Sequence, residues 1–208
     1  MHARRLKGYL SGRYLEAANP RLKDSPHQRL AAMVQENEDR VLEVFAATGF
    51  LSRIVAARFP GARISALDVS PEMVAQGRRR ARRLDNLEFV QGDATAMPYP
   101  DGSFDVVLAA FGLSGLPADV RSACLAEIGR VLTRRGRLLV ADIDDSLHRP
   151  PPLVGICRHL PRQRPAGEAQ GAPLVRQIET RGFTVVSHVA GKGRQLPFQL
   201  IVAHGSRP

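Results

Sequence analysis

The sequence feature that most constrains the fold is a short apolar segment, Val41–Val44, that runs into a turn and then into an amphipathic segment, Phe50–Phe59. The first segment has the length and apolar content of a buried strand, and the second has its apolar residues at helical spacing. An acidic residue, Asp68, ends the next apolar segment, nineteen positions after Gly49. A strand, a turn, a helix N-terminus and a later carboxylate are the layout of a nucleotide-type site in an open α/β sheet.

The turn between these two segments lacks two of the glycines that such a site normally has, because Phe45 and Ala47 stand where glycine is expected. Glycine at these positions allows a positive φ and a close approach of the ligand to the backbone. Two poses of Phe45 are open. Its ring either projects into the ligand space, where lost contacts would weaken binding about 100-fold or more, or turns into the core beneath the sheet, where binding survives in altered form.

Apolar segments of strand length alternate with amphipathic segments of helix length along the rest of the chain. Further strands are expected at Ala62–Leu67, Asn86–Gln91, Phe104–Ala110 and Arg137–Ile143, and helices at Ser70–Leu84, Pro117–Leu132 and Leu174–Thr180. Two final strands, Phe183–Val189 and Leu196–His204, are expected to form an antiparallel pair at the sheet edge. The alternation predicts an α/β fold with a mostly parallel sheet and helices on both faces.

Residues 41–208 are expected to form one domain, preceded by a polar, basic N-terminal helical extension at residues 1–40. Apolar residues at helical spacing near Tyr9–Leu15 and Leu30–Val34 suggest two short helices in this extension. They either cover a ligand cleft as a lid or simply extend the domain. The section 144–170 is rich in proline and glycine and has room for one short helix, at Leu153–His159.

Composition narrows the class of protein. The chain has 208 residues, of which 44% are hydrophobic and 24% charged, as in ordinary soluble globular proteins. Its two cysteines, Cys124 and Cys157, fit no metal or redox spacing. The sequence shows neither a signal peptide nor an apolar stretch long enough to span a membrane. These features predict a cytoplasmic protein with reduced thiols.

The formal net charge of +10 indicates affinity for polyanions, and five arginines gather in the run Arg78–Arg83. Because the other basic residues are spread along the chain, diffuse surface charge is the favoured interpretation. Contact with an anionic membrane surface stays open. The sequence has no motif and no interleaving of aromatic and basic residues that is typical of specific nucleic-acid binding. It does not indicate an oligomeric state.

Four stretches, in order, resemble the class I S-adenosylmethionine-dependent methyltransferases, and most closely the type 11 group, which includes quinone and phospholipid-headgroup methyltransferases. They are Val-Leu-Glu-Val with Thr-Gly-Phe-Leu-Ser at 41–52, Leu-Asp-Val-Ser-Pro-Glu-Met at 67–73, Gly-Asp-Ala, Met-Pro and Phe-Asp-Val-Val at 92–107, and Glu-Ile-Gly-Arg-Val-Leu with Gly-Arg-Leu-Leu-Val at 127–140. The resemblance implies a three-layer Rossmann-like methyltransferase fold, with a mostly parallel seven-stranded sheet and a reversed C-terminal strand.

The resemblance also implies roles for single residues. Asp68 matches the acid that accepts hydrogen bonds from both ribose hydroxyls of S-adenosylmethionine. Val69 and Met73 match apolar residues beside the adenine, and Asp93 with Ala94 matches the pair that binds the adenine itself. The full set of implied cofactor-binding positions is Glu43, Phe45, Ala47, Thr48, Gly49, Asp68, Val69, Met73, Asp93, Ala94 and Ala110.

On this resemblance the expected activity is S-adenosylmethionine-dependent methyl transfer to a small-molecule or lipid-like acceptor. Glu43 would support the turn, and Ala110 with Phe111 would face the reactive methyl group. The alternative is a catalytically inactive relative that binds another ligand or a partner protein, because Phe45 and Ala47 replace cofactor-loop glycines.

No catalytic triad, metal cluster or P-loop is visible in the sequence, so no catalytic residue is assigned. Side chains that could face the acceptor are Asp142, Asp144, Asp145 and His148 after the fifth strand, and Tyr9, Tyr14 and His27 in the extension. An ordinary surface position is favoured for each of them. His148 is the first to test, because it follows a strand end at the cleft and titrates near neutrality.

Overall fold

The computed structural model describes residues 25–143, 173–192 and 197–205. The elements in these ranges are, in chain order, α2 (Pro26–Ala32), β1 (Arg40–Val44), α3 (Phe50–Arg58), β2 (Arg63–Asp68), α4 (Pro71–Arg80), β3 (Leu87–Gln91), β4 (Phe104–Ala110), α5 (Ala118–Val131), β5 (Leu132–Ile143), α6 (Leu174–Thr180), β6 (Phe183–Lys192) and β7 (Pro197–Gly205).

The strands form one seven-stranded sheet in the order β3-β2-β1-β4-β5-β7-β6. Strands β1 to β5 pair in parallel, whereas β7 runs antiparallel to both β5 and β6. The predicted mostly parallel sheet with a reversed C-terminal strand is therefore confirmed. The strand order reverses between β1 and β4, and open α/β sheets bind ligands at the carboxyl ends of the strands at such a switch point.

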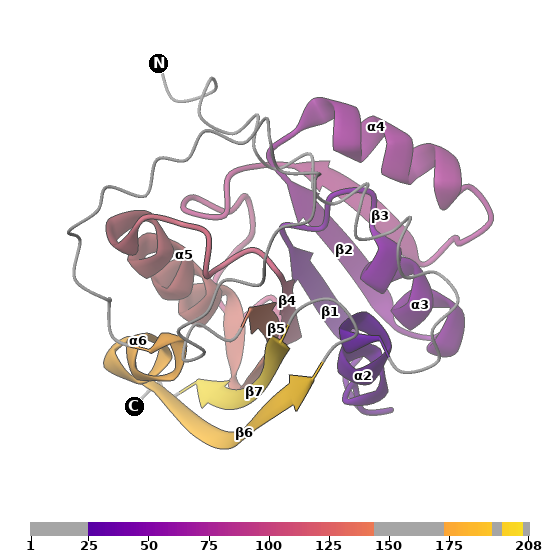
Figure 1. Ribbon diagram of the computed structural model, residues 1–208. Coiled ribbons are helices and arrows are strands. Elements are labelled where there is room, and N and C mark those ends of the chain that lie inside the picture. Colours follow the sequence, from indigo (N-terminus) through magenta and orange to yellow (C-terminus); the bar gives the residue numbers. More distant parts are fainter. Residues whose placement is uncertain (1–24, 144–172, 193–196, 206–208) are drawn as a thin grey trace, which may run out of the picture.

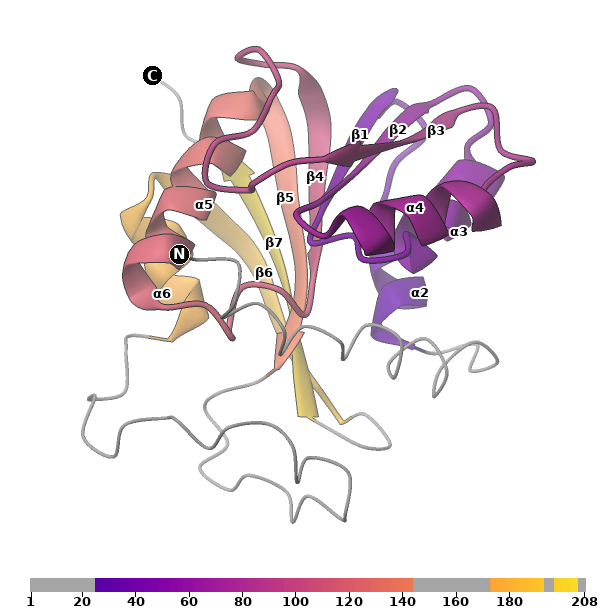
Figure 2. The ribbon, with the colours of Figure 1, turned by 90° about the horizontal axis from the view of Figure 1, so that it is seen from above.

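Helices cover both faces of the sheet, with α5 and α6 on one face and α2, α3 and α4 on the other (Figures 1 and 2). Successive residues of a strand point to opposite faces. In β1, Leu42 and Val44 accordingly pack with α5, while Val41 packs with α2 and α3. Both faces are apolar, as parallel strands covered on two sides require.

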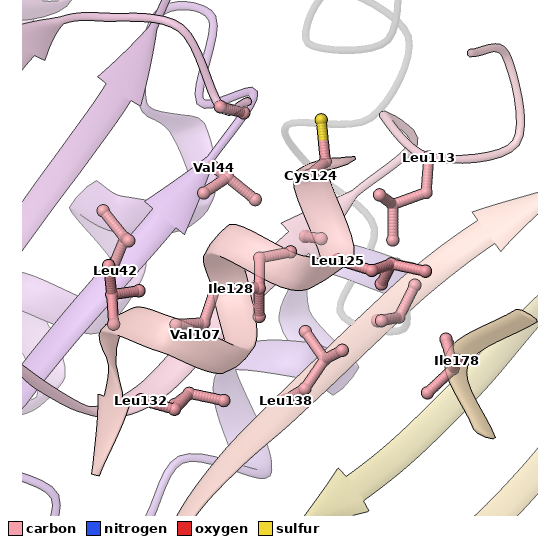
Figure 3. Close-up of a cluster of buried hydrophobic side chains, with 14 of the residues drawn as sticks. Leu42, Val44, Val107, Leu113, Cys124, Leu125, Ile128, Leu132, Leu138 and Ile178 are labelled. Carbon is pink, nitrogen blue, oxygen red and sulfur yellow. The ribbon is translucent and has the colours of Figure 1, made fainter. Parts of the chain in front are cut away.

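The core on the α5 face shows why this helix forms where it does. Leu125 and Ile128 of α5 are fully buried in one cluster with Val107 of β4 and Leu138 of β5 (Figure 3). The predicted apolar stripe of the helix thus faces the sheet. Burying each such side chain stabilises the fold by about 1.5–3 kcal/mol.

The helix α2 is packed onto the sheet. Ser25 caps it by accepting a hydrogen bond from the backbone N–H of Gln28 at 3.3 Å, and Leu30 is fully buried among residues of α3 and the strands. The loop after α2 is held by an ion pair between Arg137 Nε and Glu38 Oε1 at 2.7 Å, with both side chains largely buried. Whether residues 1–40 act as a lid stays a prediction.

Three predicted boundaries were wrong by three residues or more, one of them the end of β6, which lies at Lys192 instead of Val189. Helix α4 ends at Arg80 instead of near Leu84, because the chain turns at Ala81 (ψ 6°) and the Leu84 N–H donates to the Ala81 carbonyl. Strand β5 begins at Leu132 instead of Arg137, since Leu132 is buried and pairs with β4 ahead of an irregularity in the register. The helices predicted near residues 9–15 and 153–159 lie outside the described residues.

Candidate functional site

The loop from Phe45 to Gly49, at the carboxyl end of β1, has the backbone of a glycine-rich turn. The φ angles are 58° at Phe45, 49° at Ala47 and 70° at Gly49. A residue with a Cβ loses about 1–2 kcal/mol in this left-handed region. Hydrogen bonds hold the loop in place, from the Ala46 N–H to the Leu67 carbonyl at 3.0 Å and from the Gly49 N–H to the Ala46 carbonyl at 2.7 Å. The loop therefore has left-handed backbone at residues 45, 47 and 49, although two of these three residues are not glycine.

Asp68 joins this loop to the end of β2. Its Oδ2 accepts a hydrogen bond from the Ala47 N–H at 2.7 Å, and its Oδ1 accepts one from the Ser70 N–H at 2.9 Å. Partial burial raises the pKa of Asp68 above its ordinary value, while these two N–H donors oppose the rise. The carboxylate thus lies at the carboxyl edge of the sheet, beside the turn, where a ribose-binding acid would be needed.

Glu43 is buried beneath the loop. Its Oε2 accepts hydrogen bonds from both the N–H and the hydroxyl of Ser52, in the first turn of α3. A carboxylate at a helix N-terminus satisfies free N–H groups and is favoured by the helix dipole. Glu43 therefore fixes the start of α3, in agreement with a supporting role for the turn.

Gly49 is the loop position that has no room for a side chain. A Cβ built on Gly49 would lie 2.4 Å from Cζ of Phe89, and one built on Gly77 of α4 would lie 2.1 Å from Cε1 of the same ring. The Phe89 ring of β3 is thus wedged between the N-terminus of α3 and the middle of α4. Close packing, in addition to the positive φ, explains why glycine stands at position 49.

Phe45, at the other end of the loop, packs across the switch point. A Cβ built on Gly112, just after β4, would lie 2.2 Å from Cδ2 of Phe45, so the ring rests directly on that glycine. Phe45 is half-buried and packs against the cluster on the α5 face. Of the two open poses, the structure has the one in which the ring turns toward the core, and this ring joins the carboxyl ends of β1 and β4.

Three aromatic side chains gather on the opposite face of the same edge. The ring of His27, from α2, has its centroid 5.4 Å from that of Phe50 and 5.4 Å from that of Phe111. Phe111 follows Ala110 at the end of β4 and has a φ of 56°, another strained backbone position at this edge. His27 and Phe111 are thus brought to the site. Phe50 was missed, although its position next to Gly49 was a signal for it.

Asp142 is fully buried at the carboxyl end of β5 and holds the loop that follows β4. Its Oδ2 accepts hydrogen bonds from the N–H groups of Leu113 and Ser114, at 2.9 and 3.0 Å. Its Oδ1 accepts from the Ser114 hydroxyl at 2.5 Å and from the Ile143 N–H at 2.8 Å. Burial raises the pKa of Asp142, and these four donors oppose the rise. Both carboxylate oxygens of Asp142 thus already accept hydrogen bonds from the protein. Asp142 therefore holds the loop in place and does not face a methyl-acceptor molecule.

Four further residues that the resemblance implies for cofactor binding differ in their exposure to solvent. Val69 is exposed, while Met73 and Ala94 are buried. Asp93 is exposed, and its Oδ1 accepts hydrogen bonds from the N–H and the hydroxyl of Thr95, both at 2.8 Å. These bonds shape the loop after β3 and, among the described residues, leave Oδ2 of Asp93 without a hydrogen bond. Direct roles of all four residues in cofactor binding stay predictions.

Thr48 is fully buried and points toward α4, where its hydroxyl accepts a hydrogen bond from Arg80 Nη1 at 2.8 Å. Arg78, in the same run of arginines, donates from Nη2 to the Phe89 carbonyl at 2.7 Å. The five arginines of the run are exposed, as predicted. Because two of them brace the loop and β3, part of this charge has a structural role.

Other sequence candidates do not form a second site in the described ranges. Residues 9, 14, 144, 145 and 148 lie outside these ranges, so the suggestion for His148 stays a prediction. Within them, no group of three or more His, Cys, Asp and Glu side chains is placed to hold a metal ion. No helix of this part of the chain is long and apolar enough to cross a membrane. Burial raises the pKa of the Cys124 thiol to about 12, so this thiol is inert.

Comparison with known proteins shows which proteins this chain is similar to. A methyltransferase domain model matches residues 41–136. The demethylmenaquinone methyltransferase of Thermus thermophilus is 40% identical over 117 residues, which cover 56% of this chain and 50% of the relative. The ubiquinone/menaquinone biosynthesis C-methyltransferase UbiE of Methylobacterium nodulans is 42% identical over 103 residues, 48% of this chain and 40% of the relative. The chain thus spans about half the length of these relatives, or less.

Solved structures share the fold over most of the chain. The N-methyltransferase NodS of Bradyrhizobium japonicum, in complex with S-adenosyl-L-homocysteine, superposes with a TM-score of 0.67 at 20% identity and covers 96% of this chain and 99% of that one. The [4+2]-cyclase SpnF superposes with a TM-score of 0.67 at 18% identity, over 86% of this chain and 79% of that one. A cyclase and a methyltransferase share this fold, so fold alone does not define the reaction.

The sequence match, in contrast, falls on the strands and loops that build the edge described above, from β1 through α5. The predicted resemblance to the class I S-adenosylmethionine-dependent methyltransferases is thereby confirmed, with Phe45 and Ala47 at two positions of the first loop where glycine is expected.

Proposed function

We propose that this protein binds S-adenosylmethionine and transfers its methyl group to a quinone-like small molecule. The observation that carries the proposal is the left-handed loop at residues 45–49, tied through the Ala47 N–H to Asp68 at the switch point of the sheet. The names of the relatives, quinone methyltransferases, support the acceptor class. No observation favours the inactive alternative.

The residues at this edge fit the adenosine part of the cofactor. Asp68 is half-buried and ionisable, and it lies beside the loop at the carboxyl edge of the sheet, as ribose binding requires. Val69 and Met73 would flank the adenine, and Asp93 would accept from its amino group. When bound, S-adenosylmethionine supplies an electrophilic methyl group on a sulfonium.

The acceptor side of the site is aromatic. The rings of His27, Phe50 and Phe111 are close enough to form one surface. Flat rings of this kind stack on a planar quinone-like molecule and exclude water. Methyl transfer is an in-line displacement, so holding the acceptor aligned and dry is the main requirement. His27 adds a polar imidazole ring to the set.

The proposal is tested with S-adenosylmethionine that carries a deuterated methyl group. The protein is incubated with reduced short-chain demethylmenaquinone, and the product is analysed by mass spectrometry for one added labelled methyl group. Calorimetry with S-adenosylmethionine is run in parallel, with Asp68→Asn as the control that should weaken binding about 10-fold or more. Absence of binding at millimolar cofactor would exclude the proposal. Binding without transfer to any quinol would favour the inactive alternative.

A further inference from the structure

The first turn of helix α5 carries a buried arginine. Arg121 is only 9% exposed to solvent, and its Nε atom is fully buried. Within the described ranges of the chain, this Nε atom has no hydrogen-bond partner and the guanidinium forms no ion pair. An arginine stays charged under all ordinary conditions, and burying a charge without an anionic partner is costly. An anion that binds beside Arg121 would offset this cost.

Two carboxylates belong to the same end of the α5 face, and neither neutralises Arg121. Asp142 is fully buried, but both of its oxygens accept hydrogen bonds from backbone N–H groups and from the Ser114 hydroxyl. Asp119, in the same turn of α5, is exposed. In the part of the chain that the structure describes, the positive charge of Arg121 is therefore left for a ligand.

The same turn also has backbone donors for an anion. Pro117 is the N-cap of α5, a helix of 14 residues, and it has no side-chain oxygen to cap the first N–H groups. These N–H groups have no partner within a helix, and together with the helix dipole they attract anions. Helical side chains tilt toward the helix N-terminus, so the Arg121 guanidinium leans toward these donors. The dipole also disfavours a cation at this end, and a bound anion would offset that as well.

This turn lies at the ligand-binding edge of the sheet. Strand β4 ends at Ala110 and α5 begins at Ala118, so the first turn of α5 is at the carboxyl end of β4 (Figure 2). Leu125, four residues after Arg121, packs in one cluster with residues of β4 and β5. Residues four apart share a helix face, so Arg121 is on the side of α5 that faces the sheet, closer to the carboxyl edge. Open α/β sheets bind their ligands at this edge.

We infer that Arg121 and the N-terminus of α5 form an oxyanion site, which takes a carboxylate carried by the methyl acceptor. The assignment to the acceptor rests on the proposed function. In that function the adenosine lies at Asp68, at the end of β2, whereas α5 follows β4 on the other side of the switch point. A guanidinium and backbone N–H groups bind the two oxygens of a carboxylate through charge-assisted hydrogen bonds. The acceptor class is thereby narrowed to anionic aromatic molecules.

A matched pair of ligands tests the site. The ligands are 1,4-dihydroxynaphthalene and the same molecule with a carboxylate at position 2, both kept reduced under argon. Their dissociation constants are measured by calorimetry. The natural protein is expected to bind the carboxylated molecule about 10-fold or more tightly, since hydrogen bonds to charged groups are the stronger ones. Arg121→Met keeps the apolar stem and removes the guanidinium, so the two dissociation constants should then differ by less than about 3-fold.

Arg176→Met is the matched control. Arg176 is exposed in the first turn of α6, on the same face of the sheet, so its substitution removes the same charge without touching α5. The ratio of the two dissociation constants should stay within about 3-fold of the natural ratio. Arg121→Lys is the second variant should Arg121→Met fail to fold, as judged by circular dichroism. It keeps the charge without the planar fork, and it should lower the ratio at least about 3-fold.

The outcomes separate the inference from the proposed function. If the protein methylates reduced demethylmenaquinone but binds neither naphthalene ligand, or binds both equally, the inference is overturned and the proposed function stands. An unchanged ratio in the Arg121 variant, or an equal fall of the ratio in Arg176→Met, would overturn the inference as well. If S-adenosylmethionine and both naphthalene ligands all fail to bind at millimolar concentration, the proposed function is overturned and the inference with it.

Discussion

At each end of the loop between β1 and α3 a phenylalanine ring packs on a glycine, but the two residue types are exchanged. At one end the loop supplies the glycine, Gly49, and β3 supplies the ring of Phe89. At the other end the loop supplies the ring, Phe45, and the segment after β4 supplies Gly112. Residues 45 and 49 have the same left-handed backbone. A positive φ alone therefore does not demand glycine. Glycine is required where a neighbouring ring leaves no space for a Cβ, as at Gly49.

The two ends also differ in how firmly they are held. The ring of Phe89 is buried and wedged between Gly49 and Gly77, whereas the ring of Phe45 is only half-buried. The Phe45 side chain is therefore less tightly enclosed than the Phe89 side chain. The Gly112 end depends instead on the buried carboxylate of Asp142. Substitutions at the two ends should therefore change the free energy of unfolding by different amounts. Four substitutions in and around the loop test the comparison.

Asp142→Ala should have the largest effect. The Asp142 carboxylate is fully buried and accepts four hydrogen bonds, from Leu113, Ser114 and Ile143. The substitution leaves all four donors without this acceptor. Buried donors left without a partner cost about 1–3 kcal/mol each, and part of this is recovered when the loop opens to water, so a loss of about 4 kcal/mol is expected. The free energy of unfolding is measured by urea titration. Asp142→Asn, which keeps one acceptor oxygen, should lose less. A loss below about 1 kcal/mol for Asp142→Ala would show that the clamp is dispensable.

Gly49→Ala should destabilise the fold by about 3 kcal/mol, from the left-handed φ of the new alanine and the collision with Phe89 together. Gly77→Ala meets the same ring, but its φ is not positive. It should therefore cost less, and the difference between the two variants measures the backbone strain. Urea titration of both variants provides the comparison. Equal losses would mean that the ring contact alone explains glycine at position 49.

Gly112→Ala should cost only about 1 kcal/mol, because the half-buried Phe45 ring can turn away from the new methyl group. In a Phe45→Gly background, where the ring is absent, the same change should cost close to nothing. The four proteins of this double-mutant cycle are compared by urea titration. If the cost of Gly112→Ala is the same in both backgrounds, Phe45 and Gly112 are not a matched pair.

The sequence predicted the frame of the molecule better than the contents of its site. Strand and helix periodicity placed β1, β2, β4 and α6 within a residue or two of their observed bounds, since these elements are fixed by local patterns. The pose of Phe45 could not be predicted, because it depends on Gly112, which is remote in sequence and has no side chain to signal the contact. The sequence also could not predict that both carboxylate oxygens of Asp142 accept hydrogen bonds within the protein, because three of the four donors come from the loop after β4.

Ala47→Gly should have the smallest effect on stability, within about 0.5 kcal/mol of the natural protein. Residue 47 has a φ of 49°, so glycine would relieve left-handed strain, but it would also add conformational freedom to the unfolded chain, and the two contributions oppose each other. The Ala47 N–H that donates to Asp68 is kept in either case. A gain above about 1 kcal/mol in urea titration would mean that the loop stores backbone strain at position 47. A loss of more than about 1 kcal/mol would mean that the Cβ of Ala47 takes part in packing. Side-chain contacts, and not the positive φ, would then decide the residue type at all three left-handed positions of the loop, 45, 47 and 49.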